Sequence, residues 1–130
     1  MNPLAVQIAG VALESPLVLA SGVLGTTASS LRRVALAGAG AVTTKSCSLA
    51  PRAGHPAPCV LPWPGGLINA VGLSNPGVAA EIEEIADYRR ICATPLIVSI
   101  FAGSAAEFGK LAGRVSEARP DLIEANVSCP

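Results

Sequence analysis

Short apolar runs and helical segments alternate along this chain, and the alternation predicts its fold. Apolar runs that each lead into polar residues predict strands at 17–20, 41–44, 96–100 and 122–126. Apolar residues at helical spacing predict helices at about 29–37, 77–90 and 104–118. Because strand–helix–strand units cross over with a right hand, we expect an α/β fold with a parallel sheet.

Local signals support these boundaries. Gly38 and Gly40 follow the first helix, and Ser104 has capping-box spacing to Glu107 at the start of the third. Weak alternation around Ala9 and Gly10 predicts a small hairpin over residues 4–13.

Residues 53–80 form the longest stretch without a formal charge. A membrane span is a poor interpretation, because the stretch holds five prolines and five glycines. We expect a long loop that ends where the second helix begins.

Size and composition narrow the classes of protein. A complete eight-stranded α/β barrel needs roughly 250 residues, so 130 residues predict part of a larger enzyme. Half of the residues are apolar (51%), which suits strands that are buried on both faces. Nine basic residues balance nine acidic ones without a basic stripe, so we do not expect nucleic acid as a partner.

Neither a targeting segment nor a metal site is expected. The start, Met1 to Leu4, has no basic region of the kind that opens a secretory signal. The four cysteines show no C-x-x-C spacing, which indicates reduced thiols in a cytoplasmic protein and no metal.

Polar residues follow the predicted strands at their carboxyl ends. The fold should bring these residues to one edge, where α/β barrels build their active sites; they are Ser21, Lys45, Ser46, Ser99 and Asn126. The alternative is that strand ends simply become polar as they leave the core.

Three features could carry chemistry at this edge. Lys45 could hold a carboxylate or stabilise charge on a ring, or it could simply reach solvent. The segment 69–77 has two asparagines whose amides match an imide edge, or it is a turn in which Asn75 caps the next helix. Cys129 lies just beyond the last strand, where a thiolate could act as a base.

Taken together, four segments resemble dihydroorotate dehydrogenase, a flavin enzyme of de novo pyrimidine (UMP) biosynthesis. They occur in family order and cover the chain from end to end; they are Pro16–Gly22, Gly40–Ser46, Asn69–Gly77 and Asn126–Pro130. The resemblance implies the N-terminal half of a (β/α)8 TIM barrel. This half would comprise about four β/α units after a small β-hairpin, with residues 1–130 in one flavin-binding domain and no second domain.

The resemblance also implies a role for each matching residue. FMN would be bound by Ala20, Ser21, Lys45, Ser46, Ser99 and Asn126. Dihydroorotate or orotate would be bound by Lys45, Asn69, Ala70, Val71, Gly72, Leu73 and Asn126. Cys129 matches the catalytic base of the class 1 enzymes, and Lys45 would assist the reaction.

Within class 1, the form of residues 69–77 is closer to the B type. The resemblance then implies a partner subunit with FAD and an iron–sulfur cluster that passes electrons to NAD, and a homodimer or heterotetramer when complete. The class 2 enzymes instead have serine at the base position and an N-terminal membrane segment. The sequence departs from the family at His55, Cys59 and Ser99, where asparagine, arginine and asparagine are usual.

Two competing interpretations remain. A subunit similar to dihydropyrimidine dehydrogenase would have a similar barrel, flavin and cysteine but an uncharged substrate. An inactive module without flavin would have none of this chemistry, and we expect the 130 residues alone to be inactive.

Overall fold

The computed structural model describes residues 2–128. Within this range a parallel sheet forms from β3 (Val18–Leu19), β4 (Ala41–Thr43), β7 (Leu96–Ile100) and β8 (Leu122–Ala125), in that spatial order. The registers pair Val18 with Ala41, Val42 with Leu96 and Ile97 with Leu122. The predicted α/β class and its parallel sheet are confirmed.

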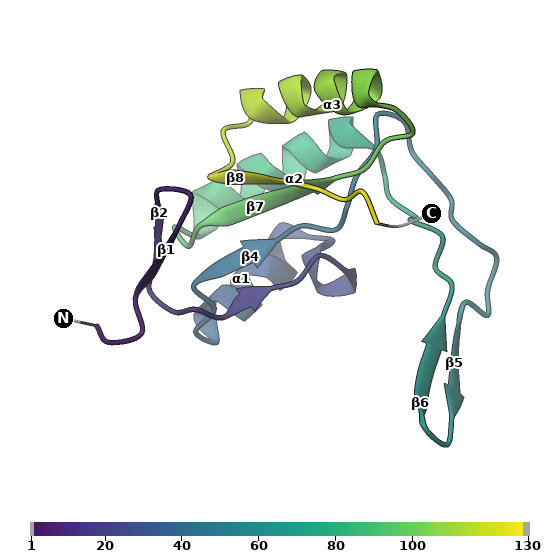
Figure 1. Cartoon of the computed structure of the whole chain (residues 1–130), viewed down its shortest axis with the longest axis horizontal. Helices are drawn as coiled ribbons and strands as arrows, with labels where there is room; N and C mark the ends of the chain where they lie inside the picture. The colour runs from purple at the N-terminus through teal and green to yellow at the C-terminus, as the bar shows by residue number, and fades with distance from the viewer. Residues whose placement is uncertain (1, 129–130) are drawn as a thin grey trace.

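Helices α1 (Ala28–Leu36), α2 (Val78–Ile91) and α3 (Ala105–Glu117) pack side by side against the sheet (Figure 1). Their apolar faces and the even-numbered residues of β7 form one core, because successive strand residues point to opposite faces. That core includes Leu31, Ile85, Leu96, Val98 and Leu111. The odd-numbered Ser99 therefore lies on the other face of the sheet.

The helix ends follow the predicted signals. Thr27 caps α1 by accepting from the backbone N–H of Ser30, and Ser104 caps α3 by accepting from that of Glu107. The Glu107 carboxylate does not close the predicted box onto Ser104 but accepts from the N–H of Gly103 at 3.0 Å.

Two antiparallel hairpins flank the sheet. The predicted N-terminal hairpin is confirmed as β1 (Val6–Ile8) and β2 (Val11–Leu13). The second hairpin, β5 (Val60–Trp63) and β6 (Gly66–Asn69), extends from the opposite end of the molecule (Figure 1).

The β5–β6 hairpin corrects the prediction that residues 53–80 are a loop throughout. Pro62 lies within β5, and an isolated hairpin tolerates it because both of its strands are edges, where a missing N–H costs little. Pro62 pairs with Leu67, and Gly66 has a φ of 148°, a value that side chains disfavour.

Candidate functional site

A cleft of about 720 Å³ opens at the carboxyl edge of the sheet. Its floor is formed by residues that follow β3, β4 and β8, and its wall by the β5–β6 hairpin and residues 69–73. The lining comprises Ser21, Gly22, Val23, Lys45, Ser46, His55, Val60, Leu67, Asn69, Ala70, Val71, Gly72, Leu73 and Asn126. Apolar walls with a few convergent polar groups are typical of small-molecule sites.

The cleft brings together most of the residues that the sequence singled out. Nine of them line it: Ser21, Lys45, Ser46, Asn69, Ala70, Val71, Gly72, Leu73 and Asn126. Ala20 and Ser99 do not line it, and Ser99 is fully buried beneath the floor. Cys129 lies outside the described residues, so its role remains a prediction.

Ser46 is the centre of a hydrogen-bond network in the floor. Its Oγ lies 2.8 Å from Ser99 Oγ and 3.1 Å from Ser21 Oγ. It also accepts from Asn126 Nδ2 at 3.2 Å, and Ser99 donates to Glu124 Oε1 at 2.6 Å. Residues from all four strand ends are therefore held in one connected arrangement.

Lys45 is positioned by a close backbone contact with the turn η1 (Val23–Gly25). The Lys45 N–H donates to Gly25 O at 2.9 Å. A Cβ on Gly25 would lie 2.5 Å from Thr43 O and 2.6 Å from Lys45 N, so only glycine allows this approach. This close contact with Gly25 holds the backbone of Lys45 in place, and with it the base of the Lys45 side chain.

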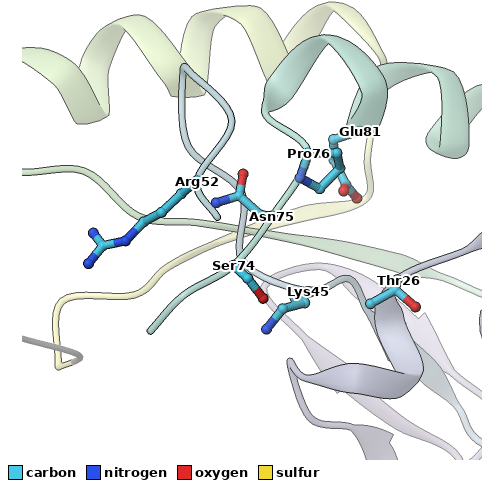
Figure 2. Close-up of a pocket in the computed structure, with 7 residues that line it drawn as sticks. All are labelled: Thr26, Lys45, Arg52, Ser74, Asn75, Pro76 and Glu81. Atoms are coloured by element: carbon cyan, nitrogen blue, oxygen red, sulfur yellow. The ribbon is translucent and has the colours of Figure 1, made fainter. Parts of the chain in front are cut away.

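Lys45 also lines a second, smaller cavity of about 220 Å³. Figure 2 shows its lining residues, which are Thr26, Lys45, Arg52, Ser74, Asn75, Pro76 and Glu81. In this view the Glu81 side chain comes from α2, and the Arg52 side chain points away from Glu81.

Glu81 is the buried acid that the sequence reasoning missed. Only 4% of the residue is exposed, and burial raises the pKa of its carboxyl from 4.5 to about 7. The nearby Glu84 carboxylate raises this pKa further, whereas the Thr44 hydroxyl lowers it. In the sequence Glu81 resembles any acid in the first turn of a helix, and no local signal marks its burial.

Asn75 holds the base of the cleft wall. Its Oδ1 accepts from the N–H groups of Gly77 and Ser48, at 2.9 and 3.2 Å. Its Nδ2 donates to Ser48 Oγ and Leu73 O, at 3.0 and 2.9 Å. Asn75 thus satisfies the N–H of Gly77 and joins two loops. Gly77 itself is the N-cap of α2, and among the described residues no side chain caps this helix, so the predicted capping role of Asn75 is wrong.

His55, for which the sequence suggested no role, stabilises the same wall. Its backbone N–H donates to Val71 O at 3.1 Å, and its Nδ1 lies 2.9 Å from Ala70 O. Gly72 packs so closely that a Cβ there would lie 2.8 Å from His55 N.

None of the three described cysteines, Cys47, Cys59 and Cys92, lines the cleft. Burial raises the pKa of the Cys47 thiol to about 12, which suits a small apolar side chain. Across residues 2–128, no three His, Cys, Asp or Glu side chains gather in a way that could hold a metal ion. Nor does the same range include a helix of the length and apolarity that a membrane span needs.

These features define an α/β protein with a ligand cleft at the carboxyl edge of its parallel sheet. Comparison with known proteins identifies the family. Residues 3–130 match the family described as Dihydroorotate dehydrogenase, and the chain belongs to that family. The resemblance seen in the sequence is confirmed, and the fold is the N-terminal part of the family's barrel.

Three archaeal proteins that are similar to this chain carry the name dihydroorotate dehydrogenase B (NAD(+)), catalytic subunit. The protein from Methanosarcina acetivorans is 45% identical over 95% of this chain and 40% of its own length. The protein from Methanothermobacter thermautotrophicus is 48% identical over 95% of this chain and 40% of its own length. The protein from Archaeoglobus fulgidus is 42% identical over 100% of this chain and 43% of its own length. The chain therefore spans about two fifths of the curated relatives that it matches, and these relatives agree with the predicted B type.

Proposed function

We propose that this chain supplies the N-terminal part of a dihydroorotate dehydrogenase active site, which oxidises dihydroorotate to orotate in pyrimidine biosynthesis. The observation that carries the proposal is the cleft: nine residues singled out from the sequence line one cavity of about 720 Å³. A chance set of polar strand ends would not include the 69–73 segment, which comes from a different part of the chain.

The cleft suits FMN in size and chemistry. Its volume is within the range of roughly 300–1,000 Å³ that small-molecule sites occupy. Apolar side chains such as Val23, Val60 and Leu67 could cover a planar ring, while Ser21 and Asn126 offer polar contacts to its edge. When bound, FMN accepts the hydride that leaves substrate C6.

The chain's own residues would bind the substrate and move one proton. Lys45 would hold the substrate carboxylate and stabilise negative charge, because a fixed ammonium in a partly enclosed cleft interacts strongly with anions. Asn69 and Asn126 would pair with the substrate ring through their amides. Cys129 would take the proton from C5, for which a thiolate is a suitable acceptor.

The name of the relatives, which gives a catalytic subunit of B type and NAD(+), supports a partner subunit and NAD as the acceptor. The family resemblance implies the other features of the complete enzyme proposed here. We propose a B-type catalytic subunit that works with an electron-transfer partner, which carries FAD and an iron–sulfur cluster and passes electrons to NAD. We also propose a cytoplasmic location, a homodimeric or heterotetrameric assembly, and one barrel domain that includes residues 1–130.

A chimaeric enzyme tests the proposed function directly. The chain would replace the matching two fifths of the Methanosarcina acetivorans catalytic subunit. After FMN is added, anaerobic stopped-flow absorbance would follow flavin bleaching by dihydroorotate and by dihydrouracil, which lacks the carboxylate.

Bleaching by dihydroorotate alone is the expected result. Preferential bleaching by dihydrouracil would instead favour the enzyme related to dihydropyrimidine dehydrogenase. A folded chimaera that binds no FMN, beside a parent subunit that does, would favour the inactive module.

A further inference from the structure

A chain of hydroxyl groups connects the cleft floor to the carboxylate of Glu124 on β8. Ser46 and Ser99 are buried, Ser21 is partly buried and Glu124 is exposed. The serine chain, Ser21–Ser46–Ser99, has oxygen–oxygen distances of 3.1 and 2.8 Å. It ends on Glu124 Oε1, 2.6 Å from Ser99 Oγ. Glu124 lies in β8, where it pairs with Ser99 of β7, and Asn126 follows just after the end of that strand.

Counting protons fixes the direction of every bond in the serine chain. A carboxylate only accepts, so the single hydroxyl proton of Ser99 is donated to Glu124. Ser99 Oγ must then accept the proton of Ser46, which leaves Ser46 without a proton for any other partner.

The direction of these bonds determines what Ser21 and Asn126 can offer to a ligand in the cleft. Because Ser46 has no proton left, Ser21 must donate its own proton to Ser46. Asn126 must turn its Nδ2 toward Ser46, as the 3.2 Å contact has it, and its Oδ1 accepts from the Ser128 N–H at 3.3 Å. Ser21 then keeps only lone pairs for the cleft that it lines.

We propose that Glu124 is a positioning residue that sets the proton direction of the serine chain, so that Ser21 offers only a hydrogen-bond acceptor to the bound ligand. The ligand group beside Ser21 is then an N–H or O–H donor, not a carbonyl or phosphate oxygen. The proton direction is a property of the protein alone, whereas the ligand's identity as a flavin rests on the proposed function.

The first test needs no ligand. In the isotope-labelled chain, NMR would record the Asn126 side-chain amide and the Glu124 carboxyl carbon across acidic and neutral pH. Protonation of Glu124 releases the constraint, so both signals should move with one midpoint. Lys45 and His55 are the ionisable residues that line the cleft.

Matched variants separate direction from general structure. Glu124→Gln should abolish the pH-dependent movement of the Asn126 amide. Glu107→Gln removes a carboxylate that bonds only the distant Gly103 N–H and should leave the movement intact. If Glu124→Gln does not fold, the titration of the unsubstituted chain decides alone, and an Asn126 amide that stays still while Glu124 titrates overturns the proposal.

The second test uses the chimaera and its flavin. Ser99→Ala breaks the serine chain beneath the floor and lets Ser46 donate to Ser21. The affinity of the chimaera for FMN should then fall about three- to tenfold, whereas Glu107→Gln should leave this affinity unchanged. Equal FMN affinities in the unsubstituted chimaera, Ser99→Ala and Glu107→Gln would overturn the claim that Ser21 accepts a hydrogen bond from the ligand. A chimaera that never binds FMN would contradict the proposed function but would leave the NMR result to decide the proton direction.

Discussion

We expect the stability of Glu81→Gln, measured relative to that of the unsubstituted protein, to be higher at neutral pH than at acidic pH. Glu81 is buried in the first turn of α2, and no salt bridge to it is present among the described residues. Burial raises the pKa of its carboxyl to about 7, so ionisation of this group opposes folding.

The sign follows from the folded-state pKa lying above the unfolded value of 4.5. Below pH 4.5 both states hold the proton, and Glu81 contributes no pH dependence. Between 4.5 and about 7 only the folded state holds it, so the free energy of unfolding falls as the pH rises through this window. At about 1.4 kcal/mol per tenfold difference, the total loss is on the order of 3 kcal/mol.

Urea unfolding at pH 5 and pH 8 measures this difference. Glu81→Gln stays neutral, so its stability relative to the unsubstituted chain should improve by about 2.5 kcal/mol between the two pH values, which is most of the total. Exposed Glu83, on the same helix, provides the control substitution Glu83→Gln. Parallel pH profiles for the unsubstituted chain and Glu81→Gln would refute the argument that Glu81 is held in a desolvated site.

Three further substitutions test the cleft. Gly25→Ala should destabilise the chain by about 1–3 kcal/mol in thermal unfolding, because the new Cβ would lie only 2.5 Å from Thr43 O. Gly109→Ala is the control and should not destabilise the chain, because a Cβ there would have no atom within 4 Å. Asn75→Ala leaves the N–H groups of two loops without partners, so it should cost about 1–3 kcal/mol and speed proteolysis between residues 53 and 77; unchanged cleavage would contradict its role. In the chimaera, Lys45→Ala should weaken orotate binding and slow flavin reduction, each by about 1.5–3 kcal/mol, and changes within about twofold would make Lys45 an ordinary lysine at the edge.

The regular elements and the position of the site could be predicted because they depend on patterns that are local in sequence. Continuous apolar runs located the sheet strands, and helical spacing of apolar residues located the helices. The carboxyl ends of parallel strands meet at one edge, so Lys45, Ser46 and Asn126 could be grouped from the sequence alone.

The elements that were missed depend on contacts between distant segments. Every residue of β5 and β6 is exposed, so the hairpin has no alternation of buried and exposed positions that the sequence could reveal. Its pairing is visible only in the fold. Burial of Glu81 results from how α2 packs beside the end of β4. The link from Ser99 to Glu124 depends on the register of β7 against β8, in which these two residues are paired.

A crystal structure of the FMN-loaded chimaera with orotate tests the central claim most directly, because it locates both molecules relative to this chain. We expect the flavin ring against Ser46 and Asn126 in the cleft, with the orotate carboxylate within hydrogen-bond distance of Lys45 Nζ and its ring beside Asn69. Flavin bound elsewhere, with the cleft between the sheet edge and residues 69–73 empty of both molecules, would contradict the account.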